Sequence, residues 1–304
     1  KLLLSLPIFL SCSADRAPGE LFGPSEAGTL VVDAVLIVDQ SLPPIHLYET
    51  AAVDQPYQRS EVAVKDAKII VTTNQNSYGY QPAADSIGQY IPIESVIISP
   101  NTSYTLEVDL PDGRKIRAST ETPDRIKVQQ LLLRDENDLS IKRELKLFSD
   151  ITAYPFDAPE NQVYYRDGII EAVVGPIDVP AYQLAIFNLE TNSQLLIEAD
   201  FLDEDDLAEF ERSGASPPLS IRDGLARLPW FGVAFEGKHL FKIYAIEQNW
   251  FDFIRTDPDA NRDGGGGLLG EQFQRPIFNI HGGIGIFASA SVDSVGFNVI
   301  KSGD

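Results

Sequence analysis

SYTLEVDLPDGRKIRAST, residues 103–120, decides the fold class of this chain. Tyr104, Leu106 and Val108 alternate with polar residues, as in a strand that buries one face and exposes the other. The Pro-Asp-Gly tripeptide at 111–113 suits a tight turn, because proline pre-sets its own φ and glycine accepts a positive φ. The stretch therefore predicts a β-hairpin.

Segments upstream of this hairpin have the composition of further strands. β-branched and other apolar residues dominate TLVVDAVLIVD (29–39), IHLYETAAV (45–53), VAVKDAKIIVTT (62–73) and YIPIESVIIS (90–99). Turn-forming residues separate these segments, and almost no helical period is present. We therefore predict that residues 29–122 form an immunoglobulin-like antiparallel β-sandwich.

The second half of the chain, residues 123–304, is less regular but also has mainly strand composition. We predict a second β-rich domain with one or two short helices. One helix is expected from Asp203 to Gly214, because Asp203 suits an N-cap, acidic residues fill the first turn and Gly214 suits a stop. The other is expected after HLFKIYAI (239–246), around Trp250, Phe251 and Ile254.

The segment IHGGIGIFASASV, residues 280–292, has small or apolar residues at both sets of alternating positions. This pattern is typical of a strand that is covered on both faces. We predict a buried strand that is integral to the second domain. Its glycines would let a neighbour approach closely, and Trp250 and Phe251 are candidate neighbours.

The first twelve residues, KLLLSLPIFLSC, resemble part of a bacterial lipoprotein signal peptide. A positive residue precedes a short apolar run, which ends in a small residue and Cys12. We expect Cys12 to carry fatty acyl chains such as palmitate and to hold the protein on a membrane. Residues 13–28 are rich in Gly, Pro, Ser and charge, which favours a flexible tether. The alternative for Cys12 is a free thiol near the terminus.

The amino-acid composition limits the kinds of molecule that this protein could bind. The chain has 304 residues with 43% hydrophobic residues, enough for a substantial core. Its formal net charge of −21 repels phosphate groups, so we expect no nucleic-acid partner. Cys12 is the single cysteine, which excludes an intrachain disulfide.

Several segments occur here in an order that resembles a known family. They are TLVVDAVL, the hairpin YTLEVDLPDGRKIRASTETP, GKHLFKIYAIEQNWFDFI and the ending PIFNIHGGIGIFASASVDSV. Together they resemble the Bacteroidota envelope lipoproteins grouped as domain-of-unknown-function family four-two-four-nine. The resemblance implies a location in the cell envelope, on the outer membrane, and a β-rich architecture. It implies no established activity, and it suggests an accessory role beside an outer-membrane nutrient importer.

One loop has oxygen ligands at alternate positions, as calcium coordination requires. An EF-hand loop would have Gly at its sixth position and Glu at its twelfth, where this chain has Arg262 and Leu268. A polar, solvated loop that leads into four glycines is the alternative to a calcium site. The candidate ligands are Asp257, Asp259, Asn261 and Asp263.

The three histidines, His46, His239 and His281, are far apart in sequence and show no paired spacing for a metal. His281, beside two glycines, is the one to watch, although a structural role with backbone hydrogen bonds is the alternative. The chain has neither a G-x-S-x-G nucleophile elbow nor a phosphate-binding loop. We therefore assign no catalytic residue and expect no cofactor, apart from possible calcium.

The leading hypothesis is a lipid-anchored envelope protein that acts by binding or as an accessory to an outer-membrane importer. A surface glycan-active hydrolase is one alternative, and a calcium-dependent adhesion module is another. A hydrolase would need two carboxylates about 5 to 10 Å apart in a pocket flanked by aromatic side chains.

Overall fold

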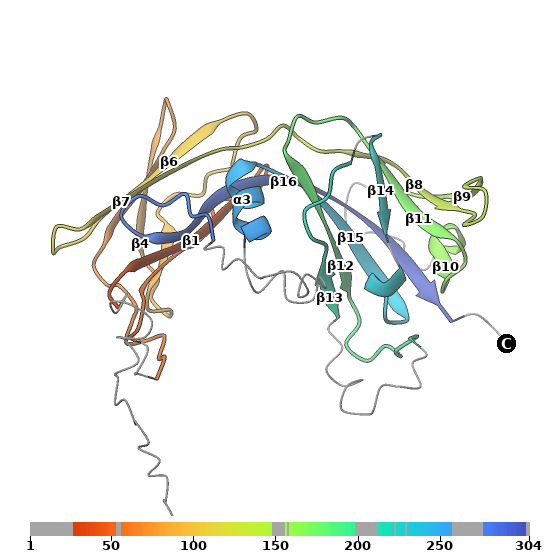
Figure 1. The fold of residues 1–304 in the computed structure, drawn as a ribbon, viewed down its shortest axis with the longest axis horizontal. Coiled ribbons are helices and arrows are strands. Elements are labelled where there is room, and N and C mark those ends of the chain that lie inside the picture. Colours follow the sequence, from red (N-terminus) through yellow and green to blue (C-terminus); the bar gives the residue numbers. More distant parts are fainter. Residues whose placement is uncertain are drawn as a thin grey trace, which may run out of the picture.

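The structure is a computed structural model that describes residues 27–52, 56–147, 156, 158–197, 212–221, 223–228, 230–256 and 276–301. Within these residues the protein is mainly β, as predicted, and forms two lobes side by side (Figure 1). The lobe nearer the N-terminus, with residues 27–121, is called the first unit below. The lobe that contains residues 126–246 is called the second unit.

Seven strands of the first unit form one strongly curved part of the larger sheet. Their spatial order is β1-β2-β5-β4-β3-β6-β7, and all neighbours are antiparallel. The inward-facing residues, including Val32, Leu106 and Val108, form one hydrophobic core. The bounds are β1 Leu30–Ile37, β2 Ile45–Glu49, β3 Lys68–Thr72, β4 Ser77–Pro82, β5 Gln89–Pro92, β6 Ser103–Asp109 and β7 Lys115–Glu121.

The second unit is a sandwich of two sheets. A four-stranded sheet in the order β14-β11-β8-β9 faces β13, β12 and β15 of the larger sheet. Leu131 and Ile170 from the first layer pack in one core with Phe241 and Ile243 from the second. The bounds are β8 Val128–Arg134, β9 Ile141–Leu145, η2 Pro159–Asn161, β10 Gln162–Tyr164, β11 Ile169–Val174, β12 Ala181–Asn188, β13 Ser213–Ala215, β14 Leu225–Leu228, η3 Trp230–Gly232, β15 Gly237–Ile246 and α3 Gln248–Thr256.

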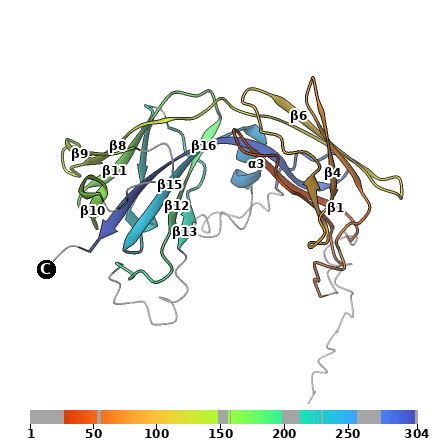
Figure 2. The same cartoon turned by 180° about the vertical axis from the view of Figure 1, so that it is seen from behind.

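A single long strand, β16 (Ile284–Ile300), belongs to both units. Figures 1 and 2 show it running from one lobe into the other. Residues 284–290 pair in parallel with β1, and residues 290–299 pair antiparallel with β15. Near its end, β16 also pairs with β10. The two units are therefore joined by a continuous hydrogen-bonded ladder as well as by connecting loops.

The predicted hairpin is confirmed. β6 and β7 pair from Ser103↔Glu121 to Asp109↔Lys115, and Gly113 between them has φ +92°. The short helix around Trp250 is also confirmed as α3. Its side chains Trp250 and Phe251 pack near Ala290 of β16, as expected.

Several predicted elements differ from the structure, and two of the predicted strands are shorter than expected, since β2 ends at Glu49 and β5 ends at Pro92. The strand expected over residues 62–73 is split, because Asp66 has φ +59°, which an extended strand does not allow. Only residues 68–72 form β3, while Ala63 pairs with Tyr48. Gly214 does not end a helix: it lies in β13 and pairs with Ile186 of β12, so the predicted end at Gly214 is wrong. Residues 203–211 of that predicted helix lie outside the described residues.

The segment 280–292 contains the predicted buried strand, and Phe287, Ala288, Ser289 and Ala290 are fully buried. Only part of the segment packs as predicted: Ala290 lies near Trp250 and Phe251, but Phe287 and Ile280 belong to the core of the first unit. The reason is the register of β16, whose first seven residues pair with β1. The domain boundary between residues 122 and 123 stays a prediction. The core of the first unit includes the side chains of Ile280 and Phe287, which follow this boundary in the sequence.

Candidate functional site: a cleft between the two units

A cleft of about 560 Å³ lies where the two units meet. The connection from β7 to β8 forms one wall, and the connection from β11 to β12 forms another. The start of α3 closes the third side. The lining residues are Asn101, residues 121–124, residues 176–180, Glu247 and Gln248.

The wall formed by residues 175–180, Gly-Pro-Ile-Asp-Val-Pro, is a stiff loop. Pro176 and Pro180 restrict their own φ angles, and Gly175 donates a backbone hydrogen bond to Lys127 O at 3.2 Å. The hydroxyl of Tyr182 donates to Ile177 O at 3.3 Å. The same loop also lines a smaller depression of about 200 Å³. Asp178, at the middle of the loop, is therefore held exposed at a defined position.

Three exposed carboxylates give the cleft a negative potential. Glu121, Asp124 and Asp178 line it, and none of the lining residues that the structure describes is Lys or Arg. The nearby guanidinium of Arg125 is engaged elsewhere: its Nε lies 2.6 Å from Asp39 Oδ2, and its hydrogen bonds hold the pKa of that carboxyl below its ordinary value. A cleft lined by one sign of charge concentrates ions of the opposite sign. This cleft therefore favours a positively charged ligand group.

Glu247 is one of the residues that line the cleft, and it caps α3. Its carboxylate accepts hydrogen bonds from Asn249 N at 2.7 Å, Trp250 N at 3.1 Å and Ser289 N at 3.2 Å. Burial raises its pKa above the ordinary value, and these hydrogen bonds act in the opposite direction. Because its oxygens already serve three backbone N–H groups, Glu247 is suited to holding the helix in place and poorly suited to proton transfer.

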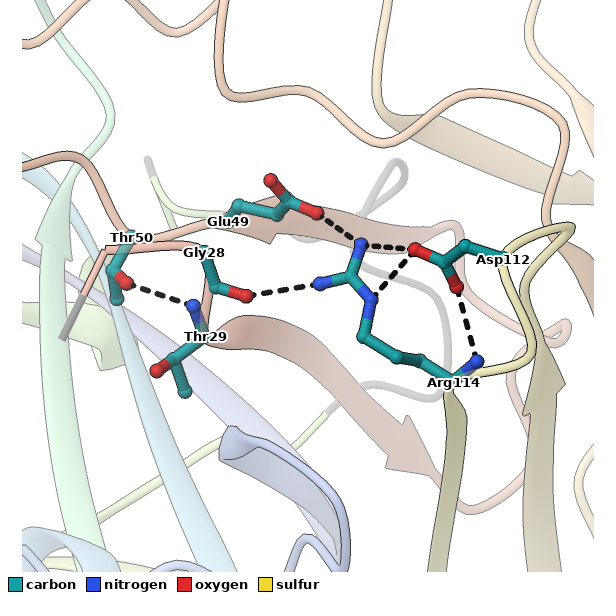
Figure 3. Close-up of polar contacts among 6 residues, drawn as sticks. All are labelled: Gly28, Thr29, Glu49, Thr50, Asp112 and Arg114. Carbon is teal, nitrogen blue, oxygen red and sulfur yellow. Dashed lines mark hydrogen bonds and ion pairs between the residues drawn. The ribbon is translucent and has the colours of Figure 1, made fainter.

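A second polar cluster holds the start of the described chain. Figure 3 shows Arg114 reaching from the hairpin turn toward Gly28 and Glu49. Its Nη1 donates to Gly28 O at 2.9 Å, and its Nη2 lies 2.5 Å from Glu49 Oε1. Its Nε donates to Asp112 Oδ2 at 2.7 Å, and these bonds lower the pKa of the Asp112 carboxyl. Gly28, near the start of the described residues, is thus tied to the hairpin turn.

The three histidines do not come together. His46 is half-buried, and its Nδ1 lies 2.9 Å from Arg59 Nη2. His239 is buried in the second unit, stacked on Phe297 with ring centroids 5.6 Å apart. His281 is exposed, and its backbone exchanges two hydrogen bonds with Arg117 of β7 at 2.9 and 3.0 Å. The backbone of His281 therefore takes part in the pairing with β7.

The remaining predicted site residues lie outside the described residues. These are Cys12 and the candidate calcium ligands Asp257, Asp259, Asn261 and Asp263. Within the part of the chain that the structure describes, no group of three or more His, Cys, Asp or Glu side chains could hold a metal ion. None of the described helices is long and apolar enough to cross a membrane.

Comparison with known proteins gives a family. Residues 20–295 match the family model described as a domain of unknown function, DUF4249. The chain belongs to this family. A comparison with curated proteins finds no match.

Three chains of solved structures also match this DUF4249 protein. One belongs to a study of how a 1.5-MDa bacterial ice-binding adhesin is retained on the host cell surface. It has 9% sequence identity and a TM-score of 0.20, and the match covers 93% of this chain and 67% of the other. A TM-score this low carries no argument about fold or function.

Sequence reasoning did not single out the cleft of this DUF4249 chain. One local signal was present, because the run Pro176 to Pro180 places an acid between two prolines and between two strands. Stiff loops between strands commonly carry binding residues. The other wall, residues 121–124, spans the predicted boundary between the two domains. Only the packing of the two units brings these segments to one cleft.

Proposed function

We propose that the protein is an envelope protein, anchored to the outer membrane through an acylated Cys12, that acts as a non-enzymatic accessory to an outer-membrane importer. The single observation that supports a binding role is the cleft between the units, with its three exposed carboxylates and its stiff loop. The partner would place a basic segment in this cleft, because the cleft and the chain as a whole are negatively charged.

The lining of the cleft suits binding better than glycan hydrolysis. Among the described residues that line the cleft, none is aromatic, and Glu247 is engaged with three backbone N–H groups. Glycosidases need one carboxyl group that donates a proton and a second that acts as nucleophile or base. The exposed carboxylates of Glu121, Asp124 and Asp178 instead offer contacts to a cationic surface.

The binding role is tested by photo-crosslinking in the natural host. A photoreactive amino acid replaces Asp178 in one strain and Glu61 in another, because Glu61 is exposed and is not among the residues lining the cleft. We expect the Asp178 position to crosslink one outer-membrane protein and the Glu61 position to crosslink none. Purified partner should then bind Asp178→Lys at least tenfold more weakly than Glu61→Lys. Equal binding by the two variants would contradict the proposal.

The anchor is tested separately with Cys12→Ser. We expect this variant to leave the membrane fraction and to lose labelling by a palmitate analogue, because acyl chains supply the membrane affinity. If the Cys12→Ser variant stayed in the membrane fraction, the lipid anchor would be rejected. The binding role of the cleft would still be decided by the crosslinking experiment.

A further inference from the structure

The first unit is completed by the far end of the chain. β1 and β7 are the outer strands of its seven-stranded part, and the first half of β16 lies between them. It pairs with β1 over seven positions, from Val31↔Ile284 to Ile37↔Ala290. Toward β7, the preceding residue His281 pairs with Arg117. The curved sheet is thus closed by residues that lie more than 150 positions after β7 in the sequence.

The first half of β16 pairs with β1 along one edge. Along its opposite edge, which faces β7, side chains take the place of a neighbouring strand. The carboxamide of Asn279 accepts a hydrogen bond from Phe287 N at 3.0 Å and donates to Phe287 O at 2.6 Å. It also donates to Ser119 O at 3.1 Å. Two positions further along β16, Ser289 N donates to the Glu247 carboxylate and Glu247 N donates to Ser289 O. The edge of β16 that faces β7 is therefore satisfied at both positions.

The space between β1 and β7 makes strict demands on the segment that fills it. A Cβ on Gly285 would lie 2.0 Å from Val32 O, and a Cβ on Gly283 would lie 2.5 Å from Leu30 O. Gly285 also has φ +110°, which side-chain-bearing residues rarely adopt. Next to these glycines, Phe287 is fully buried in the first core. The Ser289 hydroxyl lies 2.9 Å from that of Thr120 in β7.

We propose that the first unit contains a strand-binding site between β1 and β7, and that its ligand is the chain's own segment 276–290, bound in cis. Without this segment, residues 27–121 form an open sheet with two unpaired edges and an exposed core. The first unit then closes only after the end of the chain has been made. Because the remainder of β16 pairs with β15, closing the first unit also joins it to the second. This inference is independent of the proposed function.

The test uses the full chain with Gly285→Val, which blocks its own strand from the site. The probe is a synthetic peptide of residues 276–290, and the control peptide carries the same Gly285→Val change. The measurement is hydrogen exchange of the backbone amides. We expect the variant to exchange at least tenfold faster than wild type over residues 30–37 and 115–121. The wild-type peptide should restore protection there, and the control peptide should not.

Two results of this peptide experiment would overturn the proposal. One is wild-type protection of β1 and β7 in the variant, and the other is equal rescue, or no rescue, by the two peptides. If Gly285→Val fails to fold, Asn279→Asp replaces it as a milder change that removes the donors to Phe287 O and Ser119 O. Faster exchange in residues 115–121 than in β12 then supports the proposal, and uniform exchange opposes it. A strand-exchanged dimer of the wild-type chain, detected by light scattering, would overturn binding in cis.

Discussion

Gly113 combines a positive φ of +92° with open space beside its Cα, since no atom of the described residues lies within 4 Å of the position that a Cβ would take. Replacing it tests the backbone conformation of the hairpin turn alone. We expect Gly113→Val to lower the free energy of unfolding by about 1 to 2 kcal/mol, because a β-branched residue resists this region. Gly214→Val is the control, since Gly214 also has open space but no positive φ. Equal effects of the two changes in urea unfolding would contradict the assigned turn.

His239 gives the second unit a dependence on pH. Burial lowers the pKa of its imidazole to about 4, from an ordinary 6.5. The folded state therefore binds a proton at His239 less readily than the unfolded state does. The contribution of neutral His239 to the free energy of unfolding is fully present above pH 6.5 and is lost as the pH falls toward 4. The loss at pH 4 amounts to about 3 kcal/mol.

This dependence is measured by comparing wild type with His239→Gln in urea at several pH values. The difference between their unfolding free energies should change by about 3 kcal/mol between pH 7 and pH 4. His281→Gln serves as the control because His281 is exposed. A constant difference between wild type and His239→Gln across this range would show that His239 is not buried in its neutral form.

At the scale of elements, α3 depends on a residue just before its first turn. Glu247 satisfies the N–H groups of Asn249 and Trp250, and it also bonds Ser289 N of β16. Its carboxylate therefore fixes the helix to the strand that both units share. The last residue of α3 is also tied to the segment that leads into β16, because Ile277 N donates to Thr256 Oγ1 at 2.8 Å.

We expect Glu247→Ala to destabilise the protein by about 1 to 3 kcal/mol, because it removes a helix cap and leaves a buried strand amide without its acceptor. The neighbouring change Gln248→Ala is the control, since Gln248 is exposed. Thermal unfolding and hydrogen exchange of residues 249–254 provide the measurement. A Glu247→Ala protein with the same melting temperature as Gln248→Ala would show that the cap does not hold α3 in place.

At the scale of the whole molecule, charge repulsion opposes the folded state. The chain has 45 acidic and 24 basic residues, a formal net charge of −21. Salt screens this repulsion, since the Debye length falls from about 30 Å at 0.01 M to about 10 Å at 0.1 M. We expect the melting temperature at neutral pH to rise between these concentrations, by roughly 2 to 4 °C for each 1 kcal/mol gained. Equal increases of the melting temperature in NaCl and in KCl would identify screening of charge repulsion as the cause. An unchanged or lower melting temperature at the higher salt concentration would contradict this account.

The sequence by itself determined the features that depend on neighbouring residues. Turn chemistry at 111–113 and the alternation of Tyr104, Leu106 and Val108 predicted the hairpin, because both signals lie within one short segment. The mainly β class and the short helix around Trp250 followed in the same way. Local patterns misplaced the limits of β3 and the end of the predicted helix at Gly214. There, Asp66 adopts a positive φ and Gly214 pairs with a distant strand.

Only the tertiary structure decided which strands pair and where the cleft lies. β16 has the pattern of a doubly covered strand, but nothing local distinguishes β1 from any other partner some 250 residues away. The cleft likewise combines residues 121–124 with residues 176–180 and Glu247, which approach one another only when the two units pack. Strand pairing and shape complementarity are properties of the assembled chain, since each depends on contacts that form together during folding.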